Sequence, residues 1–255
     1  NDANACAVAE WKFGAGQGTK NMVFFTFGTG LGAGLILDGK LYSGTNDNAG
    51  EAGHIRLAKK GPVGFGGAGS FEGFCSGGGI TRLAKIMAAR CKEMPKCIEK
   101  MGGMDEITTK KLAEAAFAGD KFAKRVFTKS GEMLGKGLSV IIDVLNPEKI
   151  VIGGVYMRSS ALLIPAMKKV LEREALAAWN TLLPISTVVS VLSNLSHIHN
   201  AFLAFLFAIN SCINSINIFF FLDFPHRRLI KPRKIIGLAA TIDRLAADGH
   251  YQIGI

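Results

Sequence analysis

The chain has 255 residues and a formal net charge of +10, and it is long enough to bury a substantial core in one or two domains. Its five cysteines form no C-x-x-C pair and no regular spacing, which argues against a disulfide framework and favours reduced thiols in the cytoplasm. The lysines and arginines are scattered, with no arginine-rich run in residues 1–190. We therefore expect a solvated basic surface that attracts an anionic substrate, and no nucleic-acid partner.

The chain opens with a predicted helix that leads into a β-meander. Asn1 or Asp2 can cap a helix that runs to Phe13. The alanines within this segment favour the helical conformation. Three apolar runs follow, separated by a glycine-rich turn and by an Asp-Gly pair. These runs predict strands at residues 22–27, 35–37 and 40–42.

Residues 44–79 are rich in glycine and lack periodicity, and an aperiodic stretch of this length inside a compact domain usually carries function. Beyond them, apolar residues three and four positions apart predict helices at 80–91, 105–118 and 121–145. A short buried strand is expected at 149–152, and Gly153 and Gly154 end it. Ser159 or Ser160 can cap the next helix, which runs to about residue 178, and a last strand is expected at 187–192. The expected fold class is α/β.

Residues 193–255 differ in character from the rest of the chain. Residues 201–222 are almost uncharged, and basic residues follow them, which satisfies the length rule for a membrane span. Asn210, Asn214 and Asn217 are unfavourable in hydrocarbon, so a membrane contact is not the preferred interpretation. A buried or poorly folding helix is preferred, and an aberrant or foreign C-terminus is the alternative. We therefore divide the chain into a domain at 1–192 and a divergent tail at 193–255.

Two short motifs point to chemistry. The first is the turn at residues 27–34, where glycines without Cβ atoms let the backbone approach a ligand and point successive N–H groups at an anion. The second is the stretch 50–54 with Glu72 downstream, which supplies Glu51, His54 and a second carboxylate. Such groups hold hydroxyls, because each carboxylate accepts several hydrogen bonds. A phosphate-binding turn beside a set of residues that can bind a polyol is typical of a sugar kinase.

With these motifs in this order, the chain resembles the C-terminal lobe of a ROK-family sugar kinase, a branch of the actin-like ATPase (RNase H-like) superfamily. The family takes its name from repressors, open reading frames and kinases. Six stretches carry the resemblance over roughly residues 1–180: 1–4, 26–34, 38–44, 50–54, 69–72 and 150–154. The resemblance implies ATP-dependent phosphorylation of a hexose or hexose derivative, as in glucokinases, fructokinases and N-acetylmannosamine kinases.

The resemblance also implies a role for each motif residue. Asp2 would be the general base that accepts the proton of the attacking hydroxyl. The hexose hydroxyls would be held by Asn1, Glu51, His54 and Glu72. The phosphates of ATP would be bound by Thr26, Gly28, Thr29 and Gly30, and the adenosine by Gly153 and Gly154. Mg²⁺ would accompany ATP, with its main ligand in the family's N-terminal lobe.

Structural interpretations stand beside these roles. Asp2 can be a simple helix cap, and His54 can be a satisfied loop histidine. The glycines of the turn are needed by a hairpin in any case. Gly153 and Gly154 can form an ordinary strand-to-helix turn.

The chain departs from the family pattern at the structural zinc site that many ROK proteins carry. The zinc motif C-x-C-G-x-x-G-C aligns with residues 63–70, and its histidine aligns with His54. Val63, Phe65 and Ser70 stand at the three cysteine positions. Because a structural zinc needs about four nitrogen or sulfur ligands, we expect no zinc. Apolar packing of Phe65 and Phe71 is expected to hold the loop instead.

The family's N-terminal lobe, with its D-x-G-G-T phosphate loop, would precede Asn1. We therefore expect a fragment with little or no kinase activity of its own. Two alternatives stay open: a sugar-responsive repressor of the same family, whose helix-turn-helix would lie upstream, and a non-catalytic degenerate fragment. Relatives are commonly homodimers, so a homodimer is also expected, in the cytoplasm.

Overall fold

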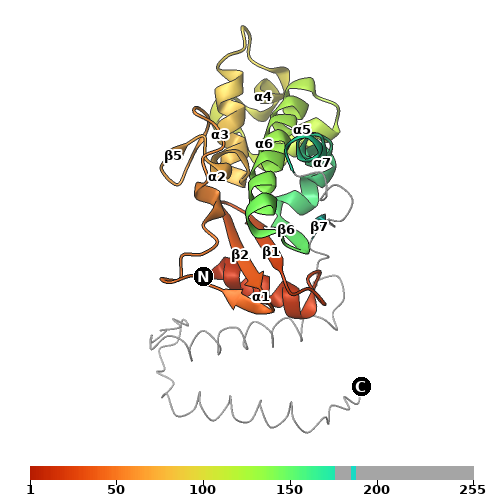
Figure 1. Ribbon diagram of the computed structural model, residues 1–255. Helices are drawn as coiled ribbons and strands as arrows, with labels where there is room; N and C mark the ends of the chain where they lie inside the picture. Colours follow the sequence, from red (N-terminus) through yellow and green to blue (C-terminus); the bar gives the residue numbers. More distant parts are fainter. Residues whose placement is uncertain (176–184, 188–255) are drawn as a thin grey trace, which may run out of the picture. The chain divides into compact units, whose positions relative to one another are not determined.

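A five-stranded sheet organises the computed structural model, which describes residues 1–175 and 185–187 (Figure 1). Strands β1, β2 and β3 pair antiparallel in sequence order, whereas β6 and β7 continue the sheet parallel to β1. The resulting order is β3-β2-β1-β6-β7. The bounds are β1 Met22–Phe27, β2 Leu31–Leu37, β3 Lys40–Tyr42, β6 Lys149–Gly154 and β7 Ile185–Thr187.

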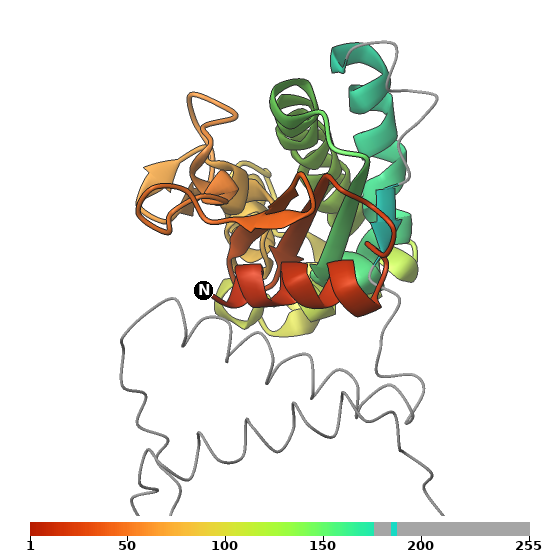
Figure 2. The ribbon, with the colours of Figure 1, turned by 60° about the horizontal axis from the view of Figure 1, so that its bottom comes forward.

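Alternate residues of β1 face opposite sides of the sheet, as the pleat of a strand requires. Met22 and Phe24 pack in a small cluster with α1 (Asp2–Phe13). Phe25 and Phe27 instead belong to the main hydrophobic core. Figure 2 shows α1 lying across one face of the sheet, with the longer helices on the other face. The sheet is thus buried on both sides, which explains the nearly continuous apolar run in β1.

The main helical layer consists of four longer helices. They are α3 Gly77–Ala88, α5 Thr109–Phe117, α6 Lys121–Leu145 and α7 Val155–Glu174. Shorter elements connect them to the meander. These are the 3₁₀ turns η1 Ala52–His54 and η2 Met104–Glu106, the hairpin strands β4 Val63–Gly64 and β5 Gly67–Ala68, and the helices α2 Phe71–Phe74 and α4 Lys96–Met101.

Two glycines of α6 allow this helix to approach α7 closely. A Cβ on Gly131 would lie 2.5 Å from the carbonyl oxygen of Leu163, and one on Gly135 would lie 2.7 Å from that of Met167. Both distances are shorter than any real Cβ contact, so only glycine fits. The pair of helices therefore forms a closely packed support behind the sheet.

The α/β class and the meander are confirmed, and α1, β1, β3 and α6 have the bounds that the sequence predicts. Strand β2 is different, because it begins at Leu31 rather than at residue 35. Its glycines continue the strand beneath α1, where a Cβ on Gly34 would lie 2.6 Å from the Ala3 carbonyl oxygen. These glycines are strand residues that permit close helix packing, and the turn itself is shorter than expected.

Side-chain caps place two helix starts away from the predicted positions. Helix α3 begins at Gly77, because the Ser76 hydroxyl oxygen accepts the Gly79 N–H at 2.9 Å. Helix α5 begins at Thr109, since the Thr108 hydroxyl oxygen accepts an N–H three residues later, at 3.2 Å.

The predicted start of α7 is wrong. The helix begins at Val155, directly after Gly154, which has a φ of +72°. Ser159 and Ser160 lie inside the helix and do not cap it. A left-handed glycine turns the chain from β6 into the helix without a side-chain cap. Short elements inside the aperiodic stretch 44–79, and helix α4, were not expected from the pattern.

Several predictions concern residues that lie outside the described ranges. They are the end of the helix at 176–178, the strand residues 188–192, the domain boundary at 192 and the tail at 193–255 with its apolar segment. Within 1–175 and 185–187, no helix combines the length and the apolar character that a membrane crossing needs.

Candidate functional site

The glycine turn is the short loop Gly28-Thr29-Gly30 between β1 and β2. The N–H of Gly28 donates to the Gly30 carbonyl at 3.0 Å and closes the loop. The carbonyl of Gly28 accepts the Gly77 N–H at 2.8 Å, and the carbonyl of Thr29 accepts the Gly78 N–H at 3.4 Å. The first turn of α3 therefore holds the loop in place through backbone hydrogen bonds alone.

The end of β6 lies directly beside this turn. In the parallel pairing of β1 and β6, Thr26 stands opposite Gly153 and Phe27 opposite Gly154. A Cβ on Gly154 would lie 2.2 Å from the Phe27 carbonyl oxygen, so glycine is required there for space as well as for its positive φ. The structure thus brings together the two stretches that the resemblance assigns to ATP.

Asp2 lies at the start of α1. The Asn1 side-chain oxygen accepts the Asn4 N–H at 2.9 Å, so Asn1 is the cap of this helix. The Asp2 carboxylate accepts the N–H of Ala3 at 2.9 Å, and Asp2 is exposed. Since Ala3 packs against Gly32 in the first part of β2, the start of α1 lies next to the strand that leaves the glycine turn.

Glu51 and His54 form a pair on the 3₁₀ turn η1. Their Oε2 and Nε2 atoms are 3.4 Å apart, and both side chains are about half exposed. The turn is fixed to β2, because the Ala33 N–H donates to the Gly50 carbonyl at 2.9 Å. A Cβ on Gly53 would lie 2.2 Å from the Leu31 carbonyl oxygen, so η1 touches the first residue of that strand.

Glu72 connects this pair with the glycine turn. It lies in the first turn of α2, and its Oε2 accepts the Leu31 N–H at 3.1 Å. The same oxygen is 2.7 Å from where a Cβ on Gly30 would be. The carboxylate is therefore seated against the end of the turn. The two predicted sets of residues, for sugar and for nucleotide, meet at this point.

The loop that aligns with the zinc motif is held together without metal ligands. The Ser70 hydroxyl donates to the Gly64 carbonyl at 3.2 Å and accepts the Gly73 N–H at 3.1 Å. Phe71 is fully buried against Phe25, as expected, with ring centroids 5.9 Å apart. Phe65 is not packed into the protein, and 76% of its surface is exposed.

The donor set of this loop does not fit zinc. Within the part of the chain that the structure describes, no three His, Cys, Asp or Glu side chains are close enough together to hold a metal ion. His54 is the single ligand that the family motif retains, and its ring contacts Phe65. Metal analysis of the purified protein is the test of the expected absence.

Three of the described cysteine thiols, those of Cys6, Cys75 and Cys97, have a raised pKa. Partial desolvation, followed by the nearby charges of Asp2 and Glu10, raises the pKa of the Cys6 thiol. Burial is also the main cause that raises the pKa of Cys97 to about 11, and it raises the pKa of Cys75 further. A raised pKa keeps these three thiols protonated at neutral pH, so they are poor nucleophiles.

One cation beside the glycine turn was not identified from the sequence. A Cβ on Gly78 would lie 3.1 Å from Arg82 Nη1 and 3.4 Å from the Thr29 carbonyl oxygen. Arg82 is exposed and stands one helical turn after Gly78. The signal that could have revealed it is this four-residue spacing on a helix that begins with three glycines.

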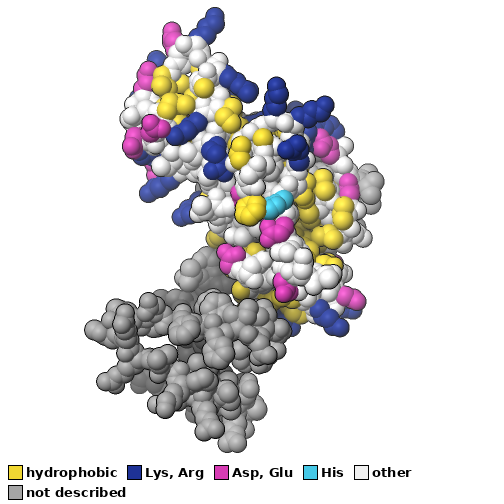
Figure 3. Space-filling model, turned by 90° about the vertical axis from the view of Figure 1, so that its left-hand side faces the viewer, with side chains coloured by type: hydrophobic (Ala, Val, Ile, Leu, Met, Phe, Trp, Pro, Cys, Tyr) yellow, Lys and Arg dark blue, Asp and Glu magenta, His cyan; other side chains and the backbone are white. Residues whose placement is uncertain are grey.

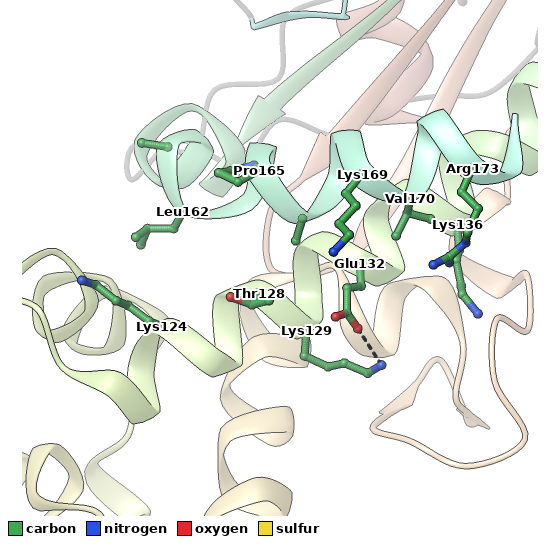
Figure 4. A pocket seen from close by; sticks show the side chains of 12 residues that line it. Lys124, Thr128, Lys129, Glu132, Lys136, Leu162, Pro165, Lys169, Val170 and Arg173 are labelled. Atoms are coloured by element: carbon green, nitrogen blue, oxygen red, sulfur yellow. Dashed lines mark hydrogen bonds and ion pairs between the residues drawn. The ribbon is translucent and has the colours of Figure 1, made fainter. Parts of the chain in front are cut away.

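A cavity of about 740 Å³ lies elsewhere, between α6 and α7 (Figure 4). Its basic lining residues are Lys124, Lys129, Lys136, Lys169 and Arg173. Glu132 pairs with Lys129 across 2.9 Å. None of the predicted site residues lines this cavity. Figure 3 shows one face of the protein, on which a histidine side chain has hydrophobic and acidic side chains beside it.

The mixed sheet, the glycine turn and the helices that hold it define a protein with the actin-like ATPase fold. Within this class the chain belongs to the ROK family, whose sequence model matches residues 1–201.

The relatives in this family include kinases and repressors. The chain is 38% identical over 180 residues to a glucokinase of Halalkalibacterium halodurans, a match that covers 69% of this chain and 54% of the relative. It is 32% identical over 222 residues to the DNA-binding transcriptional dual regulator NagC of Escherichia coli, covering 85% of this chain and 50% of the relative. The chain therefore spans about half the length of these relatives.

Two solved structures support membership of the ROK family. The ROK family glucokinase from Streptomyces griseus, in complex with glucose and AMPPNP, superposes with a TM-score of 0.64 at 32% identity. That match covers 74% of this chain and 62% of the other. The ROK hexokinase from Thermus thermophilus superposes with a TM-score of 0.65 at 27% identity, covering 83% of this chain and 65% of the other.

Proposed function

We propose that the chain supplies the sugar- and ATP-binding half of an ATP-dependent hexose kinase. The observation that carries this proposal is the position of Glu72. Its carboxylate is seated on the Leu31 N–H at the end of the glycine turn, which places a hydroxyl acceptor directly beside a bare backbone loop. Phosphoryl transfer needs such a neighbourhood, because the acceptor hydroxyl and the γ-phosphate must be held together and aligned.

In this proposal the hexose lies among Glu51, His54 and Glu72, with Asn1 nearby at the start of α1. Carboxylate oxygens accept hydrogen bonds from vicinal hydroxyls, and their fixed positions select the stereochemistry. Asp2 accepts the proton of the attacking hydroxyl. Because Asn1 is the helix cap, the Asp2 carboxylate is not needed for that structural role.

ATP is proposed to lie along the glycine turn and the end of β6. A Cβ on Gly28 would find only the Thr26 hydroxyl, at 3.7 Å, so the backbone there is open. In this arrangement the phosphates contact Thr26, Thr29 and Gly30, and the adenosine contacts Gly153 and Gly154. The Arg82 guanidinium adds a positive charge on the α3 side of the turn. A bound Mg²⁺ would neutralise phosphate charge, and the described residues offer no cluster of ligands for it.

A sugar-responsive repressor is the second candidate, since the match to NagC covers 85% of this chain. The exposed carboxylate of Asp2 favours the kinase, because sensing a sugar requires no proton acceptor. A degenerate fragment without activity is the third candidate. The homodimer and the cytoplasmic location stay predictions.

The test is a phosphoryl-transfer assay on the full-length protein with ATP and a panel of hexoses, among them glucose, fructose and N-acetylmannosamine. We expect ADP release that depends on one of these sugars. Sugar-dependent release from operator DNA without ADP formation would identify a repressor. Inert behaviour in both assays would identify a degenerate protein.

A further inference from the structure

Phe65 occupies a position that local backbone preference does not explain. It is the first of two residues, Phe65 and Gly66, in the turn of the β4–β5 hairpin, where Gly64 pairs with Gly67. Both turn residues have positive φ, +45° and +76°, as in the tight hairpin turns that favour Asn, Asp or Gly at the first position. A bulky residue in the left-handed region is strained, so another interaction must account for phenylalanine here.

Burial does not account for Phe65 either, because 76% of its surface is exposed. Its aromatic contact within the described residues is with the ring of His54, at a centroid separation of 4.3 Å and an interplanar angle of 37°. Strained residues whose conformation the surrounding structure imposes are concentrated at functional sites. The contact with His54 is therefore the interaction that most plainly distinguishes a phenylalanine at this position from the residues that the turn favours.

His54 is held from two directions. Its Nε2 atom faces Glu51 Oε2 at 3.4 Å, which fixes the direction of one ring edge. The Phe65 ring covers the imidazole and fixes the plane of the ring. Since 44% of the His54 side chain is exposed, few other contacts restrain it. Without Phe65, the contact with Glu51 would remain, but the plane of the imidazole would no longer be fixed.

The hairpin that carries Phe65 is rigidly joined to the rest of the site. The Ser70 hydroxyl links the Gly64 carbonyl to the Gly73 N–H, at 3.2 and 3.1 Å. A Cβ on Gly64 would lie 2.4 Å from the Gly73 nitrogen, so the hairpin touches the short helix α2. Glu72 lies on that helix. The hairpin that carries Phe65 is thus packed against the helix that carries Glu72, although the Phe65 ring itself is exposed.

We propose that Phe65 is a positioning residue that orients the His54 imidazole toward a hydroxyl of the bound hexose. This inference rests on the proposed function, and it assigns to an aromatic contact the task of fixing the histidine in a loop without metal ligands. A pre-oriented imidazole loses less conformational freedom when the sugar binds. The effect is therefore expected in sugar affinity and not in ATP affinity.

The experiment compares four variants of the full-length protein: Phe65→Asn, Phe65→Leu, Phe65→Tyr and the control Val63→Ala. Asparagine suits the strained turn, so Phe65→Asn should fold at least as stably as the wild type while its KM for hexose rises about 10-fold. Phe65→Leu keeps apolar bulk and should show the same loss. Phe65→Tyr keeps the ring and should restore affinity. Val63→Ala removes an exposed apolar side chain from the same hairpin and should change nothing.

NMR spectroscopy tests the proposed contact between Phe65 and His54 without relying on enzymatic activity. The carbon-bound ring protons of His54 should show an upfield ring-current shift in NMR spectra, and this shift should disappear in Phe65→Leu and persist in Phe65→Tyr. An unchanged KM for hexose in both Phe65→Asn and Phe65→Leu would overturn the inference while leaving the kinase intact. If the wild type binds no hexose at all, the proposed function and this inference fail together.

Discussion

The Oε2 atom of Glu72 accepts a hydrogen bond from the backbone N–H of Leu31 at 3.1 Å. Leu31 is the first residue after the glycine turn, so the position of a carboxylate depends on the backbone that is proposed to bind phosphate. A substitution in the glycine turn should therefore alter the position of the Glu72 carboxylate, and a substitution of Glu72 should alter the turn.

Replacing Gly30 by alanine tests this dependence. The new Cβ would lie 2.7 Å from Glu72 Oε2, and the carboxylate is the end of a flexible side chain that can move away. We expect a folded protein whose hexose affinity falls about 10-fold, because a hydroxyl acceptor is displaced. Isothermal titration calorimetry with hexose measures the effect.

Gly28→Ala is the matched control in the same turn. Its Cβ would meet only the Thr26 hydroxyl, at 3.7 Å, which is an ordinary contact. We expect unchanged melting temperature and hexose affinity, with any loss confined to ATP binding. Equal losses of hexose affinity in both variants would mean that the turn as a whole is disturbed and that Glu72 is not the cause.

Asp2→Asn separates chemistry from binding. A general base contributes about 10²–10⁴-fold to a rate, so kcat of the full-length protein should fall by that factor while hexose still binds. The helix should persist, because its cap is Asn1. Glu51→Gln is the contrasting variant and should weaken hexose affinity instead. Normal turnover of Asp2→Asn would remove Asp2 from the mechanism.

Arg82→Gln tests the cation beside the turn. A hydrogen bond to a charged group is worth about 1.5–3 kcal/mol, so KM for ATP should rise by about 10-fold or more, with KM for hexose unchanged. Lys85→Gln on the same helix is the control, because Lys85 only forms an exposed pair with Asp105 at 3.1 Å. Equal effects of both substitutions would point to general surface charge.

Glu10→Gln should stabilise the protein in a pH-dependent way. Desolvation raises the pKa of the buried Glu10 carboxyl, although its hydrogen bond from the Ala15 N–H at 2.9 Å opposes the rise. A raised folded-state pKa means that stability is lost as pH rises through the folded value. The variant should therefore gain stability over the wild type as pH rises above the ordinary pKa of a glutamate, as measured by thermal unfolding. A pH-independent difference would contradict this.

Zinc analysis tests the substituted loop. We expect less than one equivalent of zinc in the purified full-length protein, and no change of melting temperature with a chelator, because Val63, Phe65 and Ser70 provide no thiolate. One bound equivalent of zinc would refute the prediction.

Much of the fold could be predicted because local signals agree with tertiary packing. Helix α6 shows strong helical periodicity, and β1 is a nearly continuous apolar run bounded by asparagine and glycine. The start of β2 could not be predicted. Gly32 and Gly34 look like turn residues, and the role of Gly34, to admit the backbone of α1 at Ala3, exists only in the folded protein.

The candidate site could also be predicted only in part from the sequence. The residue types of Glu51, His54 and Glu72 indicate a grip for hydroxyls, and the resemblance supplies their roles. The contact between Phe65 and His54 could not be predicted, because it depends on a strained turn that places the ring in solvent. Arg82 was missed for a similar reason, since its four-residue spacing from Gly78 becomes informative only once the start of α3 is known to lie against the glycine turn.

Thr26 and Gly153 are neighbours in the sheet, although most of the helical layer separates them along the chain. During synthesis, the ribosome therefore releases the glycine turn long before β6 exists to join it. Pairings this remote in sequence form slowly, because the chain entropy of closing a long loop must be overcome first. A nucleotide that binds at this edge would stabilise finished chains and leave incomplete ones unprotected from proteolysis.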